Sequence, residues 1–129
     1  MPAALQTALI LLALLQVKHL FADFFLQTPR MLGGRDRYVH LGRAEHAGLH
    51  ALLSVIAFTA VGVPLAFTFL LCLVEMVVHY HIDWIKGRHS DKVGNTPADA
   101  SYWRAFGADQ LAHQLTYLAM IWCWGVFVL

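Results

Sequence analysis

Four long apolar stretches dominate this sequence and limit what it can fold into. They cover about residues 3–27, 46–62, 64–85 and 104–129. A helix needs about 20 mostly apolar residues to cross the hydrocarbon core of a bilayer. Only 13% of the residues are charged and 59% are hydrophobic, whereas soluble domains carry roughly 25% charged residues. The sequence therefore predicts an all-α, polytopic membrane protein, an up-down bundle of four transmembrane helices.

The 129 residues are expected to form a single integral membrane domain, because so short a chain has no room for two. Only Gly62, Val63 and Pro64 separate the second and third stretches, which predicts a tight turn and a helical hairpin. The first stretch has no basic residue before Lys18 and no evident signal-cleavage site. We interpret it as a retained helix.

The positive charges predict an orientation in the membrane. All lysines and arginines lie on or beside two longer connections, residues 28–45 and 86–103. Positive residues favour the cytoplasmic side, so we expect both connections in the cytoplasm and both termini outside. A net charge of +1 provides no basic surface for nucleic acid. Membrane lipids are therefore the expected partners, and nucleic acid is not.

Each predicted helix carries two ionisable side chains four residues apart, a spacing that places both on one helix face. The pairs are His19 and Asp23, His46 and His50, His79 and Asp83, and Asp109 and His113. Each pair lies near the end of its helix that adjoins a basic connection. In an up-down bundle all four pairs therefore reach similar depth, which predicts four histidines beneath a layer of three aspartates and His46.

The first and third stretches also resemble each other. The His19-x-x-x-Asp23 pair recurs as His79-x-x-x-Asp83, and each is followed by a basic connection and a second ionisable pair. This repeated pattern predicts two parallel helical hairpins related by a pseudo-two-fold axis along the membrane normal.

These eight side chains predict a metal centre. Imidazole and carboxylate are ligands of Zn, Fe and Mn, and helix bundles build binuclear sites from inward-facing residues. Eight ligands suffice for two divalent transition-metal ions. The alternative is ordinary contact with headgroups at helix ends, towards which Lys18 and Lys86 would extend. Four pairs at one depth favour the metal, because burying unpaired ionisable groups is costly.

Further polar residues adjoin the predicted cluster: Gln27, Glu75, Lys86 and Gln110. Glu75 lies four residues before His79 and extends the same face deeper. It could act as a proton relay or a further carboxylate, or it could pair with Gln16 or Gln114. The other three could position an anionic substrate or donate hydrogen bonds to the ligands, and their alternative is headgroup contact. His81 points away from this face and is excluded.

Four motifs resemble those of a known protein family. They are HxxxDFxLQ at residues 19–27, HxxxH at 46–50, HxxIDxxK at 79–86 and DQxxH at 109–113. The family comprises small bacterial multi-pass membrane proteins classed as a domain of unknown function. The resemblance implies a location in the bacterial cell inner membrane and names no reaction. A looser similarity to bacterial membrane-bound metal-dependent hydrolases does not extend to aligned motifs.

We predict a binuclear metal-dependent hydrolase that acts at the cytoplasmic leaflet on a lipid or isoprenoid phosphate. One carboxylate among Asp23, Asp83 and Asp109 would be the general base. Three other functions fit the same residues: a di-iron or haem redox protein, a divalent-metal or proton transporter, and a non-catalytic scaffold. A transporter would require a homo-oligomer, because four helices make a thin conduit.

Overall fold

The computed structural model describes residues 1–34 and 37–129, and its regular elements are all helices, as predicted. In chain order they are α1 (Ala3–Phe24), α2 (Pro29–Leu32), α3 (Leu41–Ala60), α4 (Leu65–Val93) and α5 (Ala100–Phe127). Arg35, one of the basic residues of the first predicted connection, lies outside the described residues.

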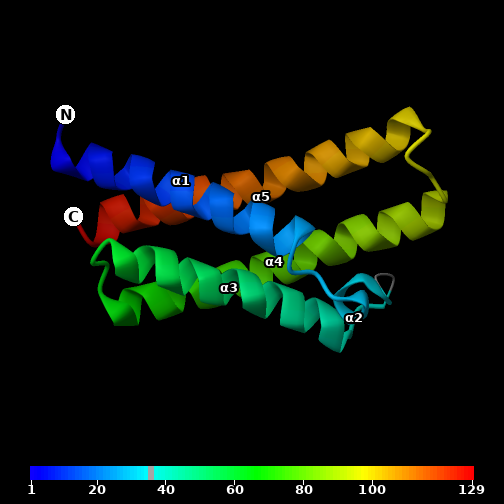
Figure 1. Cartoon of the computed structure of the whole chain (residues 1–129), viewed down its shortest axis with the longest axis horizontal. Coiled ribbons are helices and arrows are strands. Elements are labelled where there is room, and N and C mark those ends of the chain that lie inside the picture. The colour runs from blue at the N-terminus through cyan, green and yellow to red at the C-terminus, as the bar shows by residue number, and fades with distance from the viewer. Residues whose placement is uncertain (35–36) are drawn as a thin grey trace.

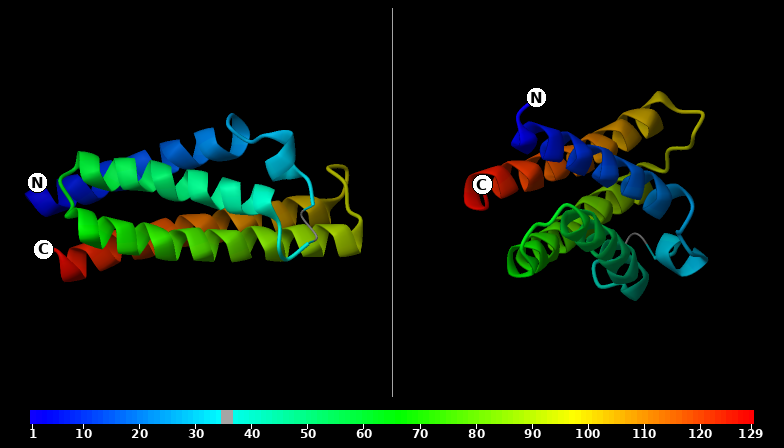
Figure 2. Two further views of the ribbon diagram at one scale, coloured as in Figure 1. Left: turned by 90° about the horizontal axis from the view of Figure 1, so that it is seen from below. Right: turned by 60° about the vertical axis from the view of Figure 1, so that its left-hand side comes forward.

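The four long helices lie side by side and alternate in direction (Figure 1, Figure 2). Both termini and the turn between α3 and α4 are at one end, and the other two connections are at the opposite end. Helix α3 contacts α1 and α4, and α5 contacts the same two helices. Within the described part of the chain, α1 and α4 are therefore diagonal neighbours, and so are α3 and α5.

Local capping, rather than hydropathy, sets the helix ends. Helix α3 begins before the predicted start at His46, because Nδ1 of His40 accepts a hydrogen bond from the backbone N–H of Arg43 at 3.3 Å. Helix α4 continues past the predicted end at residue 85 and stops at Gly94. That residue has a φ of 63°, a left-handed conformation that glycine adopts readily.

The interior changes character along the helices. Towards the termini it is filled by apolar side chains, among them Leu11, Leu15, Phe58 and Met120. Towards the other end the buried side chains are mostly histidines and carboxylates. The apolar half therefore holds the helices together, while the polar half is available for chemistry.

The outer surface of the helices is also apolar. Leu52, Leu70 and Leu115 are 58%, 63% and 54% exposed, and soluble proteins rarely expose large contiguous apolar patches. Helices α1 and α4 are long and apolar enough to cross a membrane. Helices α3 and α5 do not meet the same criterion, because their polar residues lower the mean hydropathy. Two membrane-spanning candidates indicate association with a membrane.

Candidate metal centre

The eight predicted ligands come together in the polar half of the interior. The deeper residue of each pair is at most 4% exposed, and these residues are His19, His50, His79 and His113. The side chains of Asp23 and Asp83, one turn nearer the connections, are 13% and 22% exposed. The cluster is thus closed towards the apolar core and partly open towards the connections.

Two sets of donor atoms are close enough to share an ion, with all atoms of a set within 4.8 Å of one another. One set comprises Asp23, His46, His50 and His79, and the other comprises His79, Asp83 and His113. Because His79 belongs to both, the two sets form one continuous cluster contributed by all four long helices.

The carboxylate of Asp23 directs its two oxygens to different imidazoles. Oδ1 lies 2.9 Å from Nε2 of His50 and 3.3 Å from Nε2 of His46. Oδ2 lies 3.3 Å from Nε2 of His19 on the same helix. Asp23 therefore links α1 to α3 at the centre of the cluster.

Asp83 on α4 makes an equivalent arrangement. Its Oδ2 is 3.3 Å from Nε2 of His79 and 3.6 Å from Nε2 of His46, while its Oδ1 is 3.3 Å from Nε2 of His113. Each of the two aspartates thus presents one oxygen to each side of the cluster. Carboxylates in this position can bridge two cations.

Several of these contacts have the geometry of metal ligands rather than of hydrogen bonds. Nε2 of His79 and Nε2 of His113 are buried and make no hydrogen bond, a costly state for a polar atom. A tetrahedral ion with bonds of about 2.0–2.1 Å keeps its ligand atoms about 3.3–3.4 Å apart. The 3.3 Å distances from these nitrogens to Asp83 match that spacing. An ion between them would satisfy all the atoms involved.

His19 and Asp109 lie beside these two sets without joining them. Nε2 of His19 is 3.0 Å from Oε1 of Gln110. Oδ2 of Asp109 accepts a hydrogen bond from Nζ of Lys86 at 2.8 Å, whereas its Oδ1 is buried without a hydrogen bond, 3.6 Å from Nε2 of His113. The carboxylate of Asp109 therefore has one oxygen fixed by a cation and one facing the cluster.

Gln27 and Gln110 both contact the cluster. The side-chain amide of Gln27 lies 3.2 Å from Nε2 of His46. Gln110 donates to Oδ2 of Asp109 at 3.3 Å, in addition to its contact with His19. By contrast, His81 lies outside the cluster, with Nδ1 2.7 Å from the carbonyl oxygen of Val77.

Lys18 occupies a place that the sequence analysis did not predict. It is only 6% exposed, its Nζ is 2.5 Å from Oε1 of Glu75, and it donates to the carbonyl oxygen of His50 at 3.1 Å. The alternative in which Lys18 extends towards the headgroups does not hold, because a buried counterion lies within its reach. The sequence feature that could have indicated this ion pair is that Lys18 and Glu75 each lie within an apolar part of a predicted helix.

Tyr117 is a second residue that sequence analysis missed. It is 1% exposed, and its hydroxyl lies 2.9 Å from Nδ1 of His19 and 3.5 Å from Nδ1 of His50. These contacts hold both rings from the side opposite the carboxylates, as partners of metal-ligating histidines do. Its position four residues after His113, which places both side chains on one face of α5, is the sequence feature that could have identified it.

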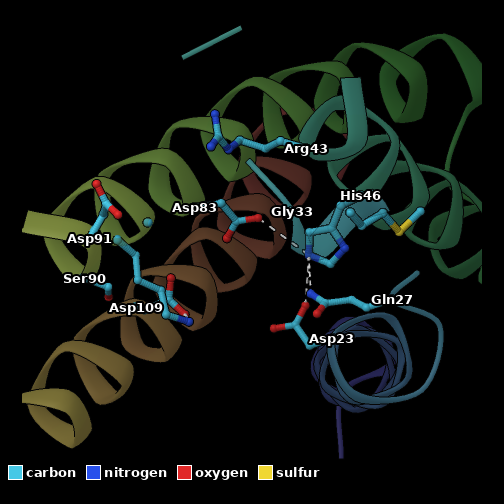
Figure 3. Close-up of a pocket in the computed structure, with 12 residues that line it drawn as sticks. Asp23, Gln27, Gly33, Arg43, His46, Asp83, Ser90, Asp91 and Asp109 are labelled. Carbon is cyan, nitrogen blue, oxygen red and sulfur yellow. Dashed lines mark hydrogen bonds and ion pairs between the residues drawn. The ribbon is translucent and has the colours of Figure 1, made fainter. Parts of the chain in front are cut away.

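A cavity of about 270 Å³ borders the cluster on the side of the connections (Figure 3). Its wall includes Asp23, His46 and Asp83, which face one another in Figure 3. Arg43 and Lys86 add positive charge to the same wall. Arg43 is held in place by the carbonyl oxygens of Arg37 and Tyr38, at 2.6 and 3.1 Å from its Nη1. The cavity thus joins the cluster to two cations.

Comparison with known proteins agrees with the predicted resemblance to an uncharacterised family. The family described as "Protein of unknown function (DUF3307)" matches residues 10–128. All eight candidate ligands lie within the matched segment. No curated protein and no solved structure matches the chain.

Proposed function

This chain belongs to the DUF3307 family of proteins of unknown function, and we propose that it is a membrane-embedded, metal-dependent hydrolase of lipid or isoprenoid phosphates. The observation that carries the proposal is the buried cluster of imidazole and carboxylate donors. Within each of its two sets, which share His79, the donor atoms lie within 4.8 Å of one another, and the Nε2 atoms of His79 and His113 have no hydrogen-bond partner.

The contacts of the two central aspartates support a centre of two ions, of Zn, Fe or Mn. Asp23 and Asp83 would bridge them, since each directs its oxygens to different imidazoles. The remaining ligands of one ion would be His46, His50 and His79, and those of the other His19 and His113. The second ion would replace Gln110 as the partner of Nε2 of His19.

The proposed location is the bacterial inner membrane, crossed by all four long helices, with both termini outside. Helices α1 and α4 have the required length and hydropathy. Helices α3 and α5 lie between them and contact both. Several of their polar residues, such as His50 and His113, are buried in the interior, so the low mean hydropathy of these helices does not describe their outer faces. The cavity would then open to the cytoplasmic leaflet.

Two cations of the cavity wall would favour a phosphate as the substrate group once bound metal ions offset the four aspartates of the same wall. Arg43 and Lys86 bring positive charge beside the cluster, and guanidinium and ammonium groups are common binders of phosphate oxygens. A membrane-embedded cavity would receive the phosphate on the end of a lipid. The proposed substrate is therefore a phosphate ester of a lipid or isoprenoid alcohol.

Hydrolysis would use Asp109 as the general base. Its free Oδ1 faces the cluster while Lys86 fixes its Oδ2. Bound divalent ions would supply an activated water. The water oxygen forms a bond to phosphorus, its proton passes to Asp109, and the bond from phosphorus to the lipid oxygen breaks. The lipid oxygen takes up a proton, which gives a lipid alcohol and inorganic phosphate.

A di-iron redox protein is the second candidate, because carboxylates and imidazoles contributed by four helices also suit two irons. The arrangement is less suitable for haem. The rings of His50 and His79 have centroids 3.9 Å apart, and those of His79 and His113 are 4.3 Å apart, so a porphyrin would have to displace them. A transport path is disfavoured by the apolar core, in which Leu11, Leu15 and Phe58 fill the far half of the interior.

The first test is the metal content of the protein purified in mild detergent without chelator. Mass spectrometry should find about two equivalents of transition metal, an estimate that follows from the number of ligands. The His50→Ala and Asp83→Ala variants should lose metal. His81→Ala is the matched control, because His81 lies on α4 outside the cluster and its removal should leave the metal in place.

Phosphate release from lipid phosphates, together with an optical spectrum, then separates the two candidates. Colourless metal with phosphate release supports the hydrolase. Iron with visible absorbance and no phosphate release supports the redox protein. A folded protein that contains no metal in any preparation would contradict both.

A further inference from the structure

A groove between α4 and α5 lies apart from the metal centre. Its volume is about 470 Å³, within the range of small-molecule sites in proteins, roughly 300–1,000 Å³. Its walls are mainly apolar, with Leu71, Val74 and Val78 on α4 and Leu115 and Ala119 on α5. On its wall composition alone, the groove suits a hydrocarbon chain.

One carboxylate lines this groove. Glu75 is only 1% exposed, and its Oε1 is bound by Lys18. Its Oε2 is buried and makes no hydrogen bond, and Glu75 forms part of the groove wall. Thr116, also in the wall, already donates to the carbonyl oxygen of Ala112 at 2.9 Å. The groove therefore combines an apolar surface with a buried carboxylate, one oxygen of which has no hydrogen-bond partner.

We propose that this groove binds a lipid alcohol, with its chain along the apolar walls and its hydroxyl group donating a hydrogen bond to Oε2 of Glu75. A buried acceptor without a donor is costly, and a ligand hydroxyl removes that cost. A lipid chain without a hydrogen-bond donor would pack against the same walls but leave Oε2 of Glu75 without a partner. Selection for the hydroxyl is thus the property that separates this site from ordinary lipid contact.

The donor is a neutral hydroxyl rather than a cation. The charge of Glu75 is already balanced by Lys18 at 2.5 Å, so a second cation would meet a neutral pair. A charged group would also have to be desolvated within the bilayer, which costs several kcal/mol. A lipid alcohol has neither problem.

This inference rests on the membrane placement proposed above but not on the metal or on hydrolysis. A lipid alcohol is also the product class of the proposed reaction. The groove would then hold the product next to the helix that carries His79 and Asp83. Binding can nevertheless be measured with no turnover.

The test uses the full-length chain in lipid nanodiscs and two photoreactive probes. One is a farnesol analogue that carries a diazirine, and the other is its methyl ether, which has the same chain but no donor. After irradiation, peptide mass spectrometry locates the labelled residues. We expect several-fold more labelling of residues 71–78 and 111–123 by the alcohol than by the ether, and competition by unmodified farnesol.

Two variants separate groove binding from general lipid contact. Ala119→Phe should fill the groove and abolish the alcohol-specific labelling, while Leu118→Phe is the matched control, because Leu118 is 49% exposed and does not line the groove. The double variant Lys18→Met with Glu75→Leu removes the acceptor and its counterion together. It should label equally with both probes.

Equal labelling of the native groove by alcohol and ether would overturn the proposal and leave ordinary lipid contact. If neither probe labels α4 and α5, and chemical cross-links form between copies of the chain, the proposal is wrong and this face is a dimer interface. The ether also tests the membrane placement separately. If the chain does not span the bilayer, the ether will fail to label the outer faces of α1 and α3 as well.

Discussion

Nζ of Lys18 on α1 lies 2.5 Å from Oε1 of Glu75 on α4, so a buried ion pair connects two diagonally opposed helices. Lys18 also donates to a backbone carbonyl of α3. The pair lies between the apolar core and the candidate metal centre, one helical turn below His79. It joins three helices at the depth where the histidines must be held in place.

Removing one partner of this pair should be more damaging than removing both. Lys18→Met leaves the Glu75 carboxylate buried without its cation, and breaking a buried pair in this way costs about 3–5 kcal/mol. The double variant Lys18→Met with Glu75→Leu replaces the pair by apolar side chains and should recover most of that loss. Unfolding in detergent, followed by circular dichroism, measures both. Equal destabilisation by the single and double variants would contradict a coupled pair.

The cluster could be predicted because its members follow the helical period. His19 and Asp23, like His79 and Asp83, are four residues apart, and such a spacing fixes which face they share. Whether these faces meet depends on how the helices pack. The contact between Asp23 and His50, on different helices, follows from that packing and could not be read from spacing alone.

Other features depend on tertiary structure that a single sequence does not reveal. The partner of Lys18 is 57 residues away in sequence, and no local pattern links them. The start of α3 depends on capping by His40, although hydropathy places it later. Tyr117 lies four residues after His113, which places both on one helix face, but its contact with His19 follows only from the packing of α5 against α1.

Tyr117→Phe should weaken metal binding while the helices remain folded. The substitution removes the hydroxyl that lies 2.9 Å from Nδ1 of His19 but keeps the aromatic ring. Loss of such a partner typically lowers metal affinity about 10–100-fold. Competition with a chelator of known affinity measures the change. Tyr102→Phe, at the start of α5, is the control and should retain native affinity.

Two glycines of α3 should respond oppositely to alanine. A Cβ at Gly42 would overlap the backbone carbonyl of Arg30 at α2, whereas a Cβ at Gly48 would meet nothing within 4 Å. Overpacking of this kind costs about 1–3 kcal/mol. Gly48→Ala should instead stabilise the helix by up to about 1 kcal/mol. Thermal unfolding of both variants checks the difference, and a neutral Gly42→Ala would show that α2 is not fixed against α3.

The proposed orientation predicts which side of the membrane reaches each connection. Ala60→Cys places a thiol near the α3–α4 turn, and Ala98→Cys places one between α4 and α5, both at exposed positions. With a membrane-impermeant maleimide, Ala60→Cys should be labelled in intact cells and Ala98→Cys only after lysis. The native chain, with Cys72 and Cys123 in apolar helices, measures the background. The reverse pattern would invert the proposed topology.

Asp109→Asn should separate metal binding from catalysis. Asp109 lies outside the two close sets of donor atoms, and its Oδ1 has no hydrogen bond, so most of the metal should remain when the carboxylate becomes an amide. Without the general base, lipid phosphate hydrolysis should fall about 10²–10⁴-fold. Glu45→Gln is the matched control, since Glu45 is a surface carboxylate paired with Arg30. If the variant keeps both its metal and its full activity, the general base is Asp23 or Asp83. If the variant loses its metal, Asp109 is a metal ligand.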